Sequence, residues 1–160
     1  MNSNNYKTIG IMGGMGPEAT VQLFDYIVKG TNAKHDQEHI PILINNYPLI
    51  PDRTQALLYG GESPVSLLTK GIKTLADAGA DFILIPCNTS HAFLTEIQNA
   101  VNIPIVNMID ETALYTKNLY SNIKKIGLLA TTGTVNTQLY QNAYKKENVE
   151  VIVPYKKDQE

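Results

Sequence analysis

Cys87 is the residue whose chemistry and position point most directly to a reaction. It follows an apolar run at residues 82–86 and precedes Asn88, Thr89 and Ser90, which are typical first residues of a helix. A thiol between a strand and a helix lies where backbone N–H groups and the helix dipole favour the thiolate. The pattern predicts a reactive cysteine, although a small buried residue in a capped turn fits it too.

Three histidines could assist a thiol or bind a metal. His91 stands four residues after Cys87 and could form a Cys–His pair, but a histidine that is hydrogen-bonded in the core is the more common outcome. His35 and His39 are also four residues apart, which would bring both imidazoles together on a helix. Their surroundings are typical of a polar loop before Pro41, so we expect no metal site there.

Two glycine-containing turns could hold an anionic group with backbone N–H groups. They are Gly13-Gly14-Met15-Gly16-Pro17 and Thr131-Thr132-Gly133-Thr134, and each follows an apolar run. The first turn also fits the glycine pattern of dinucleotide-binding proteins. That pattern requires an acidic residue near the end of the second strand, where this sequence has Asn45-Asn46, so we do not expect a dinucleotide. The second turn can equally be a capped turn without a ligand.

Arg53 lies in the long segment after the second predicted strand, within Pro51-Asp52-Arg53-Thr54. Its guanidinium could clamp a carboxylate with two parallel hydrogen bonds. The spacing allows equally that Arg53 pairs with Asp52 or Glu62 at the surface. The residues alone leave both alternatives open.

Apolar runs that alternate with segments of helical spacing must position these side chains. Runs rich in isoleucine, valine and leucine predict strands at residues 8–12, 42–44, 82–86, 103–108, 125–130 and 149–153. Helical spacing and capping residues predict helices at residues 17–29, 64–78, 90–100 and 110–119. The alternation predicts an α/β protein with a parallel sheet flanked by helices, and such sheets bind ligands at the carboxyl ends of their strands.

The sequence contains an internal repeat. Residues 9–16 reappear in similar form at residues 126–133, and Thr20 then aligns with Thr137. Each copy predicts a strand, a glycine-containing turn and a helix. The chain is therefore expected to divide into a first α/β domain at residues 1–120 and the opening portion of a second, similar domain at residues 121–160.

The predicted second domain holds few elements. A strand, a helix and a strand after Tyr120 cannot bury both faces of a sheet, so this part must pack against the first domain or another chain. Val149, Ile152 and the strand at residues 126–130 would otherwise leave apolar surface exposed. We therefore expect a homodimer.

Composition argues against several classes of function. Lys and Arg number 13 against 15 Asp and Glu, without a basic block, so nucleic acid is not an expected partner. The apolar runs fall far short of the ~18 residues of a spanning helix and the N-terminus lacks a signal-peptide pattern, so we expect a cytoplasmic protein without a membrane partner. A single cysteine cannot form an internal disulfide, so stability must come from a packed core.

Several of these motifs occur together, in order, in one known family. The sequence resembles the cofactor-independent aspartate racemases of the aspartate/glutamate racemase superfamily over nearly its whole length. The segments that carry the resemblance are Ile9-Gly10-Ile11-Met12-Gly13-Gly14-Met15-Gly16-Pro17-Glu18-Ala19-Thr20, Asp36-Gln37-Glu38-His39, Ile50-Pro51-Asp52-Arg53-Thr54, Pro86-Cys87-Asn88-Thr89 and Leu128-Leu129-Ala130-Thr131-Thr132-Gly133-Thr134. The resemblance implies a pseudo-symmetric two-domain α/β fold, here with the second domain incomplete, and an active site in the cleft between the domains. It also implies interconversion of L- and D-aspartate without pyridoxal phosphate or another cofactor.

The resemblance further implies roles for individual residues. One cysteine thiolate removes the Cα proton from one face of the amino acid, and the thiol of a second cysteine donates a proton to the other face. Cys87 matches the first cysteine, and Arg53 matches the residue that binds the side-chain carboxylate. The other substrate-binding positions that match are Met15, Gly16, Asn88, Thr89, Thr131, Gly133 and Thr134.

The second cysteine is where this sequence departs from the family. Shifting Cys87 by the repeat distance places its counterpart at about position 204, beyond Glu160. The sequence therefore predicts impaired racemisation by this chain. It leaves open a non-catalytic dicarboxylate-binding remnant of the same fold, and an isomerase or decarboxylase of acidic substrates that needs one cysteine.

Overall fold

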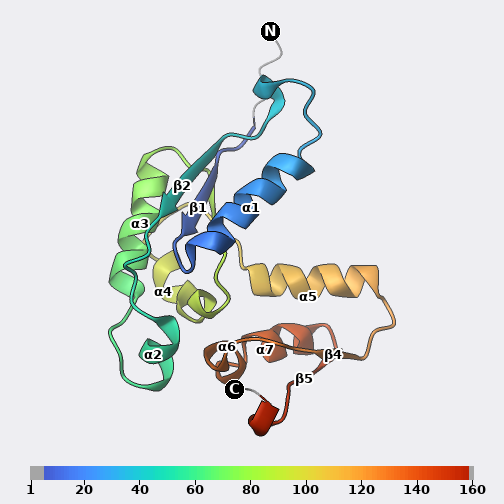
Figure 1. Ribbon diagram of the computed structural model, residues 1–160. Helices are drawn as coiled ribbons and strands as arrows, with labels where there is room; N and C mark the ends of the chain where they lie inside the picture. The colour runs from blue at the N-terminus through green and yellow to red at the C-terminus, as the bar shows by residue number, and fades with distance from the viewer. Residues whose placement is uncertain (1–5, 159–160) are drawn as a thin grey trace. The chain divides into compact units, whose positions relative to one another are not determined.

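The computed structural model describes residues 6–158, which form two compact units, each with an apolar core (Figure 1). The first unit consists of the residues up to Ile50 together with Pro64–Cys87 and Phe93–Val106. The second consists of Pro51–Ser63, Asn88–Ala92 and the residues from Asn107 onward. Each unit therefore combines segments that are distant in the sequence.

A three-stranded parallel sheet forms the centre of the first unit. Its strands are β1 (Ile9–Gly13), β2 (Ile42–Asn46) and β3 (Phe82–Leu84), in the order β2-β1-β3. Every residue of β1 is buried, as expected for a central strand that is covered on both faces. The expected parallel α/β architecture is therefore present in this unit.

The strand predicted at residues 103–108 is not formed. Ile105 makes only an isolated parallel bridge to Ile83. Pro104 lacks the N–H group that a sheet ladder requires. Asn107 caps the next helix, accepting hydrogen bonds from two backbone N–H groups, and this ends the extended segment.

Helices cover the sheet of the first unit. They include α1 (Pro17–Gly30), α3 (Val65–Asp77) and α4 (Leu94–Gln98), and a 3₁₀ helix spans Asp36–Glu38. The helix predicted at residues 90–100 is instead a 3₁₀ helix at Thr89–Phe93 followed by the short α4. The core formed between the sheet and the helices contains Met12, Met15, Ile50, Leu68, Ile72, Leu75, Ala80, Ile83, Ile85, Ile97 and Ile105.

In the part of the chain that the structure describes, the second unit has a two-stranded parallel sheet and four α-helices. Its elements are α2 (Arg53–Leu58), α5 (Met108–Leu119), β4 (Lys125–Gly127), α6 (Thr132–Asn136), α7 (Leu139–Lys146) and β5 (Glu150–Ile152). Its core contains Ile109, Ala113, Leu128, Tyr140, Ala143, Tyr144 and Val149. Packing of α5 against α7 places a helix from before Tyr120 in this compact unit. The division into domains at residues 1–120 and 121–160 stays a prediction.

Two details of the segment after Tyr120 differ from the prediction. Two helices, α6 and α7, stand where one was expected, because Gln138 between them adopts the left-handed conformation (φ 55°). Val149 is buried in the core, whereas Leu129 and Ile152 are 86% and 51% exposed. Part of the predicted apolar surface is therefore present, and the homodimer stays a prediction.

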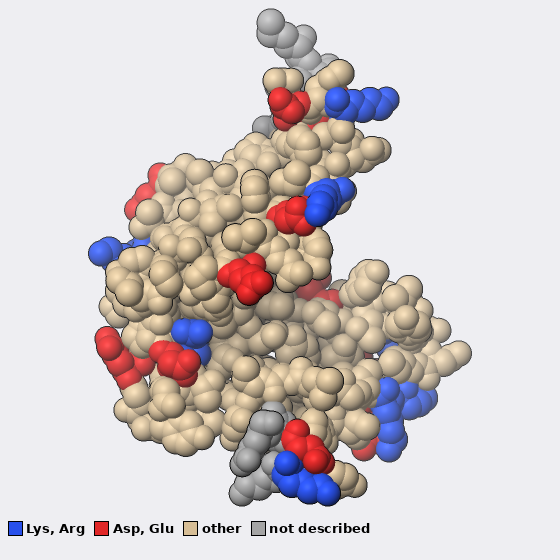
Figure 2. Space-filling model, viewed as in Figure 1, with Lys and Arg blue, Asp and Glu red and all other residues tan. Residues whose placement is uncertain are grey.

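Charged side chains of both signs are scattered over the face shown in Figure 2. Solvent-exposed ion pairs such as Lys29–Asp25 and Lys125–Glu150 contribute little to stability. No helix within residues 6–158 combines the length and the apolar character needed to cross a bilayer.

Candidate functional site

The first glycine turn is closed by a buried threonine. The Gly14 N–H group donates to Thr20 Oγ1 at 3.0 Å. Gly14 has a φ of 98°, and a Cβ atom there would overlap the backbone of Tyr47, so only glycine fits. Gly16 is exposed and is the N-cap of α1, whereas Met15 is buried in the core.

The two copies of the repeat share a hydrogen bond as well as a sequence. Thr20 Oγ1 donates to the Gly16 carbonyl at 3.4 Å, and Thr137 Oγ1 donates to the Gly133 carbonyl at 2.9 Å. Both copies consist of a parallel strand, a turn and a helix. The repeat predicted from the sequence is therefore also a repeat of local structure.

Three threonines of the second unit form a hydroxyl cluster, here called the threonine cluster. Thr89 Oγ1 lies 2.9 Å from Thr134 Oγ1 and 3.3 Å from Thr131 Oγ1, and the last two atoms are 3.1 Å apart. Thr134 and Thr89 are 1% and 7% exposed, whereas Thr131 is exposed. Thr131 Oγ1 also caps α6 by accepting the Thr134 N–H group. The cluster thus joins the segment after Cys87 to the turn of the second repeat.

Gly133 brings helix α2 close to this cluster. A Cβ atom on Gly133 would lie 2.5 Å from Thr54 Oγ1 and 3.1 Å from Thr89 Cγ2. Because glycine has no side chain, α6 can pack closely against α2 at this position. Arg53 precedes Thr54 and is half-buried, and its Nη1 group donates to the Pro51 carbonyl at 3.0 Å. Asp52 caps α2 by accepting the Gln55 N–H group.

Two further polar residues of the segment after Cys87 have partners in the second unit. Asn88 Oδ1 accepts a hydrogen bond from the Tyr140 hydroxyl at 2.7 Å. His91 is 4% exposed, and its Nε2 atom accepts the Met108 N–H group at 3.3 Å. An accepting Nε2 belongs to a neutral imidazole, which agrees with a hydrogen-bonded core histidine.

Cys87 is half-buried and packs against the core of the first unit. Its backbone N–H group donates to the Ile85 carbonyl at 2.8 Å. Because the following segment is a 3₁₀ helix, Cys87 does not precede the long α-helix that was expected at residues 90–100. The dipole of a long helix is therefore not available to its thiol.

The predicted site residues fall into two groups. The second unit holds Arg53, Asn88, Thr89, Thr131, Gly133 and Thr134, and the first holds Met15, Gly16 and Cys87. Cys87 and Asn88 are consecutive in the chain. Sequence analysis missed Tyr140 and Thr54, because an aromatic residue on a predicted helix is typical of core packing and a threonine in a predicted connecting segment is typical of exposed surface.

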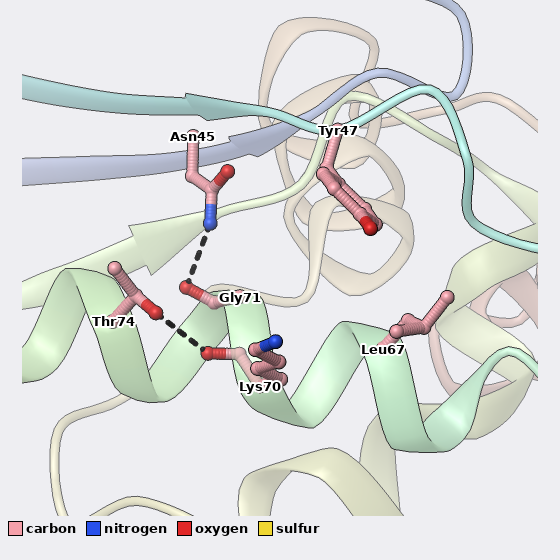
Figure 3. A pocket seen from close by; sticks show the side chains of 6 residues that line it. All are labelled: Asn45, Tyr47, Leu67, Lys70, Gly71 and Thr74. Atoms are coloured by element: carbon pink, nitrogen blue, oxygen red, sulfur yellow. Dashed lines mark hydrogen bonds between the residues drawn. The ribbon is translucent and has the colours of Figure 1, made fainter.

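The first unit also contains a cavity of about 220 Å³, and none of the residues that line it is a predicted site residue. Asn45 and Tyr47 line it from the end of β2, and Leu67, Lys70, Gly71 and Thr74 line it from α3 (Figure 3). The Asn45 amide donates to the Gly71 carbonyl at 3.3 Å, which ties the strand to the helix. Within residues 6–158, no group of three His, Cys, Asp or Glu side chains is arranged to hold a metal ion.

Comparison with known proteins identifies the family. Residues 12–160 match the family model described as Asp/Glu/Hydantoin racemase. The chain belongs to this family. The predicted family and the predicted fold, with parallel sheets flanked by helices, are therefore confirmed.

Individual relatives are similar over most of this chain. It is 32% identical over 148 residues to the broad specificity amino-acid racemase RacX of Bacillus subtilis, a match that covers 90% of this chain and 63% of that protein. The Picrophilus torridus aspartate racemase structure shares 38% identity with a TM-score of 0.86, covering 96% of this chain and 63% of the other. An aspartate racemase homologue from Pyrococcus horikoshii shares 27% identity with a TM-score of 0.74, covering 96% and 66%. The chain thus spans less than two thirds of the length of these proteins.

Proposed function

We propose that this chain binds aspartate or a similar dicarboxylic amino acid and moves the proton on its Cα atom through the Cys87 thiol. The observation that carries the proposal is the threonine cluster. Thr89, two residues after Cys87, is hydrogen-bonded to Thr131 and Thr134 of the second repeat. Family membership and the names of the relatives, an amino-acid racemase and an aspartate racemase, support a substrate of this class.

The proposed reaction requires a base and a set of hydrogen-bond donors. The Cα proton of an amino acid is weakly acidic, and its removal leaves negative charge on the carbon and its carboxylate. The Cys87 thiolate takes the proton, and the electron pair is delocalised into the carboxylate. Donors that could stabilise this charge are the Asn88 amide and the threonine hydroxyls. Return of the proton from the same thiol retains the configuration, and delivery from an acid on the opposite face inverts it.

Arg53 is proposed to select the substrate. A guanidinium can form two parallel hydrogen bonds with a carboxylate, which favours a side chain that ends in an acid. Its position at the first residue of α2, beside the Thr54–Gly133 contact, supports a role near the threonine cluster. Alanine, which lacks the second carboxylate, is then a poor ligand.

Solvent exchange tests the proposal directly. The 160-residue chain is incubated in deuterium oxide with L-aspartate and, separately, with L-alanine, without added cofactor. Deuterium at Cα is measured by mass spectrometry and the configuration by chiral chromatography. We expect exchange with aspartate, and a loss of about 100-fold or more in Cys87→Ser, the range of acid–base catalysis.

The outcomes separate the alternatives. Exchange with retained configuration supports a single-base reaction by this chain, and exchange with inversion supports a racemase. Aspartate binding without exchange overturns the catalytic proposal and leaves a dicarboxylate-binding protein. Equal exchange by wild type and a folded Cys87→Ser variant, checked by circular dichroism, refutes the role of the thiol.

A further inference from the structure

The Tyr140 hydroxyl is hydrogen-bonded to Asn88, which is a proposed substrate-binding residue. Tyr140 lies in the first turn of α7 and is 9% exposed. Its hydroxyl donates to Asn88 Oδ1 at 2.7 Å. Among residues 6–158, Tyr140 is the only hydrogen-bond partner found for the Asn88 side chain.

This contact restricts what Asn88 can offer to a ligand. A primary amide has one accepting oxygen and two donating N–H bonds. Tyr140 occupies one of the two lone pairs of Oδ1 and turns this oxygen toward itself, so the other branch of the amide, Nδ2, which donates, is the group best placed to meet a ligand. Carboxylate oxygens accept hydrogen bonds, so this orientation suits an acidic amino acid.

We infer that Tyr140 is a positioning residue that holds the Asn88 amide with its N–H groups toward a bound dicarboxylic amino acid. The inference rests on the proposed function, because Asn88 is assigned to the substrate there. It adds a residue to the site that contacts no substrate itself and acts through Asn88.

The surroundings of Tyr140 favour a fixed donor. Its ring stacks with that of Tyr144, with centroids 6.5 Å apart and planes 24° apart. The Tyr144 hydroxyl lies 2.9 Å from Thr116 Oγ1, which anchors the neighbouring ring to α5. Burial, and secondarily Tyr144, raises the pKa of the Tyr140 hydroxyl above its usual value, so this group keeps its proton at neutral pH.

A reversed amide makes the opposite prediction. In that orientation Asn88 Nδ2 would donate to the Tyr140 oxygen, and Oδ1 would face the ligand. An Asn88→Asp variant separates the two arrangements, because it still accepts the Tyr140 hydroxyl but offers only carboxylate oxygen to the ligand. A donating Asn88 requires that this variant lose affinity for aspartate.

Tyr144→Phe provides a matched control. It removes one hydroxyl from the same helix and the same core, together with a hydrogen bond of similar length, without touching Asn88. Both Phe variants keep the aromatic ring, so changes that come only from packing or stability affect both.

The experiment is calorimetric titration of the 160-residue chain with L-aspartate. We expect Tyr140→Phe to raise the Kd about 3- to 10-fold, the effect of one hydrogen bond, and Tyr144→Phe to change it less than 2-fold. Asn88→Ala should weaken binding at least as much as Tyr140→Phe. Adding Tyr140→Phe to Asn88→Ala should then have no further effect, because Tyr140 acts only through Asn88.

Failure of the inference differs from failure of the proposed function. A wild-type chain that does not bind aspartate overturns the proposed function and, with it, the role given to Tyr140. A wild-type chain that binds aspartate, with unchanged affinity in a folded Tyr140→Phe variant or in Asn88→Asp, overturns the inference alone. Additive losses in the double variant also overturn it, because they place Tyr140 in contact with something other than Asn88.

Discussion

Replacing Gly133 by alanine should push helices α2 and α6 apart. The added Cβ atom would lie 2.5 Å from Thr54 Oγ1 and 3.2 Å from Thr54 Cβ. Rotation about χ1 moves the Thr54 oxygen away but leaves its Cβ atom in place. The backbone of one helix must therefore shift, and Thr89 Cγ2 at 3.1 Å limits movement on the other side.

The expected loss of stability follows from two opposing effects. Overpacking a tight contact costs about 1–3 kcal/mol, whereas alanine gains roughly 0.5–1 kcal/mol over glycine in a helix. The net loss in the free energy of unfolding should be about 1–2 kcal/mol. Thr54→Ala removes the nearest atom, so the double variant should recover about half of this loss or more.

Gly16→Ala is the matched control, since Gly16 aligns with Gly133 in the repeat. No atom lies within 4 Å of a Cβ atom placed there, so only a weaker N-cap, worth about 0.5 kcal/mol, is expected. Urea unfolding followed by circular dichroism gives both values, and hydrogen exchange assigns the loss to α2 and α6. Equal effects of the two substitutions, or no recovery with Thr54→Ala, would refute this account of the contact.

Two other perturbations test the second unit. Thr134→Val should lower the free energy of unfolding by about 1–3 kcal/mol, because it removes a hydrogen-bond partner of the buried Thr89 hydroxyl. The control Thr132→Val, at an exposed position of α6, should change the free energy of unfolding by less than about 0.5 kcal/mol. Equal losses for the two variants in urea unfolding would contradict a stabilising role of the threonine cluster. Stability should fall as the pH rises past about 10, because the raised pKa of Tyr140 lets the folded chain keep a proton that the unfolded chain releases. The stabilisation from Tyr140 is complete at pH values below its pKa in the unfolded chain, and it is lost as the pH rises through its pKa in the folded chain. If the unfolding midpoint of a Tyr140→Phe variant falls with rising pH as steeply as that of wild type, Tyr140 is not responsible for the loss of stability.

The alternation of apolar runs predicts most of the fold because its determinants are local. Five of the six predicted strands occur, and the helix predicted at residues 64–78 is α3 at Val65–Asp77. The exception, residues 103–108, contains Pro104, which has no N–H group to donate to a neighbouring strand. Isoleucine and valine nevertheless predict a strand there, because both have high β-propensity.

The membership of the second unit could not be predicted from local patterns. The pattern of residues 51–63 is typical of a polar connection, and that of residues 88–92 predicts the start of a helix. Both segments nevertheless pack with α6 and its neighbours. Their assignment depends on side-chain pairs that are far apart in the sequence, such as Thr89–Thr134 and Asn88–Tyr140. Spacing within one segment contains no information about such partners. The resemblance to a family supplied Asn88, Thr89 and Thr134, but neither Tyr140 nor these contacts.

One difference in sequence between the two copies of the repeat changes where the following helix begins. Gly14 has no side chain, so α1 starts only at Pro17, after an uncapped Gly16. At the position equivalent to Gly14 the second copy has Thr131, whose hydroxyl caps α6 and starts it at Thr132, two residues earlier in the repeat. Gly133 therefore lies inside the first turn of a helix and against α2, while Gly16 lies outside and exposed. The same Thr131 hydroxyl belongs to the threonine cluster, so a single substitution between the copies both moves the helix start and provides a polar group for the candidate site.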